Sequence, residues 1–256
     1  EIYHLAAQSY PKTSFDEGIL TFNTNISGTY NLLDSIKILN LKPFIHVCSS
    51  SEVFGKVDKA NLPINENCSY HPASPYAISK VGTDLVGKYF FEAFKQKILI
   101  TRMFTHTGPR RGDVFAESSF AKQIALIENK KIPKIIKVGN LDSLRTYADV
   151  RDAVKAYHLL LTKNPKAGEI YNIGGNFTCS VREMLEYLLS LSKIKNIKIK
   201  IDKERIRPID ADLQVPDTSK FRNHTKWNPK ISFKKTMKDL LEYWRIRVKN
   251  TNFLDR

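Results

Sequence analysis

Cysteine is scarce in this sequence, and the three residues present, Cys48, Cys68 and Cys179, are odd in number and far apart. This pattern argues against a disulfide framework and favours a reducing compartment, so we expect a cytoplasmic protein. Long apolar runs are also lacking, since none approaches the ~20 residues that a membrane-spanning helix needs. The opening Glu1-Ile-Tyr-His4 does not resemble a signal peptide. We therefore expect no membrane partner.

Acidic residues are few relative to basic ones: 26 Asp and Glu against 41 Lys and Arg give a formal net charge of +15. Such an excess can indicate nucleic-acid binding, but the lysines are scattered rather than gathered in one motif. We expect no nucleic-acid partner. A basic surface would also attract a phosphate-bearing small molecule, and a lysine-rich source proteome explains the excess equally well.

The first half of the chain alternates between two kinds of apolar pattern. The expected strands span residues 2–7, 43–48 and 97–104, and the expected helices span 24–40 and 74–95. This order predicts an α/β fold with a parallel sheet and helices on both faces. Ligands bind such sheets outside the carboxyl ends of the strands. The loops after Ala7, Cys48 and Phe104 should therefore line one crevice.

The second half is less regular. We expect helices at 115–129, from about 152 onward, at 180–191 and at 233–248, with strands at 169–174 and 196–202. Val154 is expected to face inward, and the alternation of Ile with polar residues in 196–202 predicts a half-buried strand. Ser180-Val-Arg-Glu183 has the form of a capping box. No repeat or low-complexity linker separates the halves, so they should pack as one body.

Two stretches carry the residues suited to chemistry. The strand at 43–48 ends in Ser49-Ser-Ser-Glu52, and the helix at 74–95 opens with a natural N-cap and a proline at its first position. Tyr76 and Lys80 then lie one turn apart on the same face, where an ammonium group favours an ionised phenol. With Ser50 and Glu52 they would form an acid/base site for redox chemistry. The alternative is an ordinary exposed helical pair.

These motifs, in this order, resemble a known family. His4-Leu-Ala-Ala-Gln-Ser9, Ser49-Ser-Ser-Glu-Val-Phe-Gly55 and Tyr76-x-x-x-Lys80 are similar to the extended short-chain dehydrogenase/reductases that act on nucleotide sugars. The chain looks most like the GDP-mannose 4,6-dehydratases, with the GDP-4-keto-6-deoxymannose reductases as near relatives. The resemblance implies that residues 1–112 are the remainder of a Rossmann-like, dinucleotide-binding domain. Residues 113–256 would mainly form a smaller nucleotide-sugar-binding part, with some segments returning to the first sheet.

One departure concerns the cofactor phosphates. The family begins with a strand and a Gly-rich turn that cradles the pyrophosphate, and none of the 11 glycines here forms such a turn. We infer that roughly the first 60 to 70 residues of the family pattern are absent, which corresponds to three strands and their helices. The chain would then be a fragment or a truncated product with an open sheet edge, and its ability to bind the cofactor stays open.

The resemblance implies a division of catalytic tasks. Tyr76, as phenolate, would take the O4 proton of a hexose, with Lys80 lowering its pKa and Ser50 orienting O4. Glu52 would remove the C5 proton. Alternatively, Glu52 caps a loop or binds a ribose hydroxyl.

The resemblance also implies a cofactor, NADP or NAD, with NADP favoured. Its expected contacts are Leu5, Ala6, Ala7, Gln8, Ser9, Tyr76, Lys80, His106 and Arg111. The loop that carries His106 and Arg111 has Thr105 in place of the family's Asn, and it shares Gly108-Pro109 with the reductases. No metal is expected.

The expected substrate is a GDP-hexose, clamped at its diphosphate by Arg145 and Arg207, whose guanidinium groups suit bidentate contacts. Arg207 precedes Pro208 and an acidic residue, Asp210 or Asp212. Arg145 could instead form surface salt bridges to Asp149 or Asp152.

The reaction implied by the resemblance is a 4,6-dehydration. A 4-keto reductase and a 4-epimerase remain alternatives on the same fold, and an inactive fragment that serves as an interaction module is a third. Members of the family often pair through two long helices, and the helices expected at 24–40 and 74–95 are the candidates here. The resemblance therefore predicts a homodimer or homotetramer.

Overall fold

The fold is organised on a parallel sheet. A computed structural model describes residues 1–209 and 211–249. Its first sheet has the order β1–β2–β3–β7, formed by β1 (Ile2–His4), β2 (Phe44–Ser50), β3 (Lys97–Met103) and β7 (Ile170–Ile173). All three pairings are parallel, with Ile45 opposite both Ile2 and Ile98. The predicted parallel α/β sheet is confirmed.

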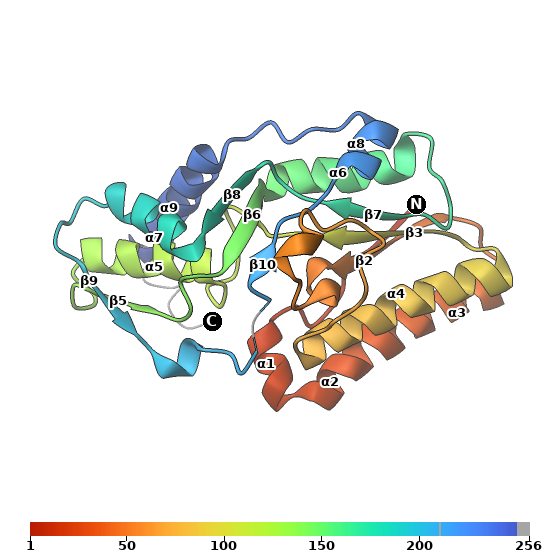
Figure 1. Cartoon of the computed structure of the whole chain (residues 1–256), viewed down its shortest axis with the longest axis horizontal. Helices are drawn as coiled ribbons and strands as arrows, with labels where there is room; N and C mark the ends of the chain where they lie inside the picture. Colours follow the sequence, from red (N-terminus) through yellow and green to blue (C-terminus); the bar gives the residue numbers. More distant parts are fainter. Residues whose placement is uncertain (210, 250–256) are drawn as a thin grey trace.

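Helices cover both faces of this sheet (Figure 1). On one face, α3 (Gly28–Ile38) and α4 (Pro75–Phe94) bury Leu33 and Phe90 against Ile45 and Ile98. On the other, α6 (Val150–Thr162) and α8 (Ser219–Thr225) pack on β3 and β7. The sheet is therefore the middle layer of three, as in Rossmann-like folds. Among the described residues β1 pairs only with β2, so the sheet has the open edge that we expected.

The helical segment after β1 starts earlier than predicted. After α1 (Pro11–Asp16), the chain is helical from α2 (Gly18–Phe22) through a π-helical turn, Asn23–Ser27, into α3. The polar run at 23–25 conceals the helical period. Buried Asn25 explains it, because its side-chain amide donates to the Gln8 carbonyl (3.0 Å) and Ser79 Oγ (2.8 Å) and accepts from the Gln8 N–H (2.8 Å). Asn25 thus ties the loop after β1 to α4.

The rest of the chain forms a second apolar core beside the sheet. Here α5 (Ala116–Glu128), α7 (Val181–Ser190) and α9 (Phe233–Lys249) pack together with β5 (Ile135–Val138). Nearby, β6 (Leu144–Asp149) pairs with β4 (His106–Thr107), β8 (Phe177–Ser180) and β10 (Leu213–Gln214). The predicted capping box of α7 is present. The inward stripe of α9, Met237 to Trp244, is buried as predicted.

Two predictions about burial were wrong. The strand expected at 196–202 exists as β9 (Lys198–Ile201), but all four residues are exposed, because β9 pairs with β5 at the margin of the molecule (Figure 1). Val154 is 58% exposed rather than inward. The first turn of α6 passes the mouth of a cavity instead of the core, and Val154 lines that cavity.

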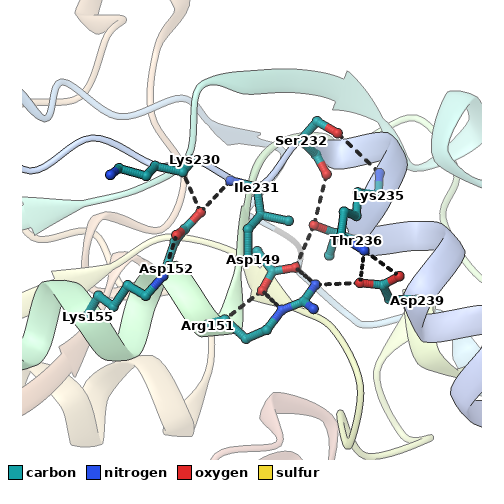
Figure 2. A network of polar contacts seen from close by, with 10 residues as sticks. All are labelled: Asp149, Arg151, Asp152, Lys155, Lys230, Ile231, Ser232, Lys235, Thr236 and Asp239. Carbon is teal, nitrogen blue, oxygen red and sulfur yellow. Dashed lines mark hydrogen bonds and ion pairs between the residues drawn. The ribbon is translucent and has the colours of Figure 1, made fainter.

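A polar network joins the start of α6, which packs on the sheet, to α9 in the second apolar core. Figure 2 shows buried Asp149 accepting from the Arg151 backbone N–H, from the Arg151 guanidinium and from Thr236 on α9. Arg151 also pairs with Asp239 of α9 at 2.7 Å. Asp152 accepts from the Lys230 and Ile231 backbone N–H groups at 2.8 and 2.7 Å. The last strand residue of β6 is thereby fixed relative to α9.

The long loop after β2 is clamped by a buried ion pair. Arg102 of β3 donates to Asp84 of α4 (2.8 Å), to the Tyr70 hydroxyl (2.7 Å) and to the Glu66 carbonyl (2.8 Å). The loop begins with a 3-10 turn, Ser51–Phe54, and its turn residue Gly55 has φ +52°; a Cβ there would lie 1.6 Å from the His71 carbonyl oxygen. Only glycine fits this approach.

Among the residues that the structure describes, no helix is both long and apolar enough to cross a membrane.

We predict that Asp84→Ala lowers the free energy of unfolding by about 3–5 kcal/mol, because it leaves Arg102 buried without its partner. Asp34→Ala, which breaks the exposed Lys37–Asp34 pair on α3, is the matched control and should cost less than about 1 kcal/mol. Urea unfolding of both variants measures this difference. Equal losses in the two variants would contradict the assigned role of the Arg102–Asp84 pair.

Candidate active site

A cavity of about 470 Å³ opens at the carboxyl ends of β1, β2 and β3. The three loops predicted to meet there do so: Leu5, Ala7 and Ser9 follow β1, Ser49 to Glu52 lie at the end of β2, and Phe104 to His106 follow β3. The second part of the chain closes the other side with α5, β6 and the segment around residues 205–207. The predicted crevice is confirmed.

The cavity gathers most of the residues that we expected to act together. Lining it are Leu5, Ala7, Ser9, Ser50, Glu52, Tyr76, Lys80, His106, Arg111, Arg145 and Arg207. Of the expected cofactor contacts in the described part of the chain, Ala6 and Gln8 are outside this lining. The Gln8 side chain donates to Thr21 (3.0 Å) and its backbone is held by Asn25, so it braces the loop. The roles of Ala6 and Gln8 at the cofactor stay predictions.

Tyr76 lies in the first turn of α4, where Ser74 caps the helix by accepting from the Ala77 N–H at 3.0 Å. Burial raises the pKa of the Tyr76 phenol well above its usual value, because a phenolate loses hydration there. A hydrogen bond with Ser50 and the positive charge of Arg111 act in the opposite direction. The site thus contains the groups that would stabilise an ionised phenol.

Lys80 is buried one turn further along α4. Its Nζ donates to the Cys48 carbonyl at the end of β2 (2.8 Å) and lies 6.0 Å from the centroid of the Tyr76 ring. Burial lowers the pKa of Lys80, while Cys48 and Asp84 partly oppose that shift. Because an ammonium has three donors, two remain for other acceptors in the cavity. That Lys80 lowers the Tyr76 pKa stays a prediction.

Glu52 presents a carboxylate beside these two residues. Its backbone N–H donates to Ser50 Oγ (3.2 Å), which caps the 3-10 turn, and its Oε1 lies 3.9 Å from Arg207 Nη1. The side chain is 17% exposed. The backbone, rather than the carboxylate, therefore makes the capping contact, and the carboxylate can meet a ligand.

Three arginines also line the cavity, where Arg145 of β6 is joined by Arg205 and Arg207. Arg205, whose Nη1 donates to Ser119 Oγ (3.0 Å), was missed; the alternation Arg205-Ile-Arg207 could have indicated it. Asp149 and Asp152, considered as partners of Arg145, bind the groups shown in Figure 2. Of the two acidic residues expected after Pro208, Asp210 lies outside the described residues.

His106 and Arg111 lie on the loop after β3. Burial lowers the pKa of His106 to about 4, so its ring is neutral at pH 7. Its Nδ1 lies 3.2 Å from the Phe104 carbonyl, which can only accept, so Nε2 remains an acceptor. The Arg111 guanidinium stacks on Phe115, 3.3 Å from the ring centroid. Two further buried residues that sequence reasoning missed, Glu117 and Tyr157, line the same cavity.

A sequence model of one family, described as GDP-mannose 4,6 dehydratase, matches residues 1–240. The chain belongs to this family. The match covers both the sheet and the second apolar core. The resemblance stated from the motifs alone is confirmed.

Individual relatives carry two different names. The chain is 31% identical over 248 residues to a GDP-6-deoxy-D-mannose reductase of Pseudomonas aeruginosa, covering 97% of this chain and 81% of that protein. It is 29% identical over 262 residues to a GDP-mannose 4,6 dehydratase of Drosophila melanogaster, covering 94% of this chain and 65% of that protein. Among solved structures, RMD from Pseudomonas aeruginosa, in complex with NADPH, superposes with a TM-score of 0.88 at 30% identity, covering 96% and 81% of the two chains.

We predict that Ser50→Ala shifts the pH midpoint of activity to higher pH, because the lost hydrogen bond raises the pKa of Tyr76 further. Activity that requires the phenolate is present above this pKa and lost below it. Ser35→Ala, an exposed hydroxyl on α3, is the control. A pH–rate profile measures the shift; an unchanged midpoint in Ser50→Ala would contradict the contact's role.

Proposed function

We propose that the chain carries the catalytic site of a nucleotide-sugar 4,6-dehydratase, which converts GDP-mannose to GDP-4-keto-6-deoxymannose. The observation that carries the proposal is the Glu52 carboxylate in the same cavity as Tyr76, Ser50 and Lys80. Besides a nicotinamide cofactor, oxidation and reduction at C4 need only the phenol and its neighbours. Elimination across C5 and C6 needs in addition a base, and we assign that role to Glu52.

The residues present fit a nicotinamide cofactor on the side of the cavity lined by α4 and the β3 loop. Lys80 has donors beyond the one that Cys48 accepts, His106 offers a neutral ring acceptor, and Arg111 adds a positive charge. The relative RMD was solved with NADPH, which favours NADP. When bound, such a cofactor supplies the acceptor and donor of hydride at the hexose.

Proton transfer at O4 is assigned to Tyr76. As phenolate it accepts the O4 proton, and Ser50, in hydrogen-bonding contact with the phenol, orients O4. The buried ammonium of Lys80 adds positive charge within 6.0 Å of the ring and holds the cofactor ribose. These roles require that the two side chains share a helix face, as they do on α4.

The second proton transfer is assigned to Glu52. A ketone at C4 acidifies the C5 hydrogen, and the carboxylate removes this proton and returns it to the departing C6 hydroxyl, which leaves as water. A double bond between C5 and C6 results, and hydride from a bound nicotinamide would reduce it at C6. The diphosphate is assigned to Arg145 and Arg207, which line the cavity together with Arg205. Paired guanidinium groups suit phosphate oxygens, and Arg207 also lies near Glu52. The substrate thus spans from the arginines to Tyr76.

We predict that Glu52→Gln loses about 10²-fold or more in formation of the 4-keto-6-deoxy product, since general bases contribute about 10²–10⁴-fold. Glu92→Gln, an exposed change on α4, is the control. Product formed from GDP-mannose is measured by its 4-keto absorbance in alkali. Wild-type-like turnover of Glu52→Gln would sink the assignment.

A reductase of GDP-4-keto-6-deoxyhexoses is the second candidate. The Pseudomonas aeruginosa relative and the Gly108-Pro109 loop favour it. Supplying the 4-keto compound together with NADPH separates the two reactions, because only a reductase consumes NADPH. Failure of both reactions, and of epimerisation at C4, would leave the interaction module that the sequence also allows.

We also propose a homodimer or homotetramer built on α3 and α4. These helices present apolar side chains to solvent: Tyr30, Ile78, Leu85 and Tyr89 are 42%, 47%, 52% and 48% exposed. An apolar face on two long adjacent helices is a surface that a second copy could bury.

Leu85→Glu should therefore shift the protein to monomers in multi-angle light scattering. Ile246→Glu, a similarly exposed site on α9, should leave the mass unchanged. A monomeric wild type would refute the assembly.

A further inference from the structure

Arg111 is held from several sides at the edge of the cavity. Its guanidinium carbon lies 3.3 Å from the centroid of the Phe115 ring, and its Nε lies 3.6 Å from Glu117 Oε1. Its backbone is fixed as well, because its N–H donates to the Gly108 carbonyl (3.1 Å) and its own carbonyl accepts from Ser118 Oγ (2.6 Å). The loop position of Arg111 is therefore set by α5, on which Phe115, Glu117 and Ser118 lie at or near the first turn.

This support extends to the last helix. Trp244 of α9 donates from Nε1 to Ser118 Oγ at 2.8 Å, so an indole, a hydroxyl and the Arg111 carbonyl form one chain. Trp244 is itself buried in the core that α5, α7 and α9 share. The second part of the fold thus reaches the cofactor side of the cavity through these contacts.

Glu117 is the unusual member of the group. Its side chain is 7% exposed, and within the described chain Glu117 Oε1 and Arg111 Nε are both buried atoms without a hydrogen bond. At 3.6 Å they are too far apart for a hydrogen bond, yet close enough for a strong charge interaction away from water. A buried carboxylate needs such a partner, and the first turn of a helix also favours a negative charge.

We propose that Glu117 is a positioning residue, whose buried carboxylate holds the Arg111 guanidinium on Phe115 so that its charge faces the reacting end of the cavity. The inference rests on the proposed function, because it assigns Glu117 to the same site. Glu117 acts through Arg111 and does not itself touch the reacting atoms. Nothing in the Tyr-x-x-x-Lys pattern or the strand-end motif indicates it.

The reach of the Arg111 charge gives the proposal its consequence. The Arg111 charge lowers the pKa values of Tyr76 and Tyr157, where burial has a larger effect in the opposite direction. It also lowers the pKa of His106, where burial has a larger effect in the same direction. The other groups that act on Tyr76 are Ser50, Cys48 and Glu52. Among Arg111, Ser50, Cys48 and Glu52, Arg111 is the group that carries a positive charge. If its anchor is removed, the guanidinium can leave, and the pKa of Tyr76 rises.

Glu117→Gln tests the proposal, since it keeps the shape and removes the charge. We expect kcat/KM to fall at least about tenfold and the pH midpoint of kcat to move to higher pH. Glu117→Asp, which keeps the charge, should retain the wild-type midpoint. Asp113→Asn, the same change on the same loop in the Lys122 pair, is the control for charge alone. An unchanged or lower midpoint in Glu117→Gln overturns the proposal.

A double-mutant cycle separates action through Arg111 from independent action. In an Arg111→Gln background, Glu117→Gln should cost less than about twofold further, because the residue it positions is gone. If the fold-losses in kcat/KM of the two single variants multiply in the double variant, the proposal is overturned.

The NMR signal of the Arg111 Nε–H, assigned with Arg111→Lys, provides a readout without turnover. We expect a protected signal in the wild type that is lost in Glu117→Gln; the same signal in both proteins overturns the pairing. If the wild type has neither dehydratase nor reductase activity, the proposed function fails, while this signal still decides whether Glu117 holds Arg111.

Discussion

The contact between Lys80 and the Cys48 carbonyl joins the two elements on which the site is built. A buried ammonium requires a partner, and the Cys48 carbonyl near the end of β2 provides one. Because Lys80 lies on α4, the contact sets the first turns of that helix against the end of the strand. Tyr76, one turn earlier, then comes to lie beside Ser50, and Glu52 follows on the same loop.

Several buried polar contacts maintain that arrangement. The Arg102–Asp84 pair fastens the loop after Glu52 to both α4 and β3, and Asn25 fastens the loop after β1 to α4. Each lies next to the cavity rather than in it. Such groups are costly to bury unless satisfied, so their presence beside the strand ends suits elements whose relative position must be precise.

The proposed chemistry of the site depends on opposing effects on the pKa of Tyr76. Burial disfavours the phenolate, whereas the hydrogen bond with Ser50 and the charge of Arg111 favour it. Ser50 lies at the end of β2, and Arg111 lies on a loop that α5 supports. The sheet loops and α5 therefore act on one site, and the α6–α9 network in Figure 2 fixes the helix that packs on the sheet relative to the second apolar core.

Much of this protein could be predicted from local patterns in the sequence. The strand and helix order, the capped start of α4 and the helical spacing of Tyr76 and Lys80 depend on neighbouring residues and on the periods of strand and helix. The start of the helical segment before α3 could not be predicted, because it depends on the contact of buried Asn25 with Ser79 of α4. The exposure of Ile199 and Ile201 could not be predicted either, because it depends on where β9 lies in the fold.

The sequence by itself therefore determined the parallel sheet and the edge at which the loops after Ala7, Cys48 and Phe104 meet, since these follow from local hydrogen-bond geometry and side-chain period. The other expected contacts of the site came from the resemblance to the family. Only the tertiary structure decided which groups surround Tyr76. Arg205, Glu117 and Tyr157 are distant from Tyr76 in sequence, and they line the same cavity because α5, α6 and the segment at 203–209 pack around it.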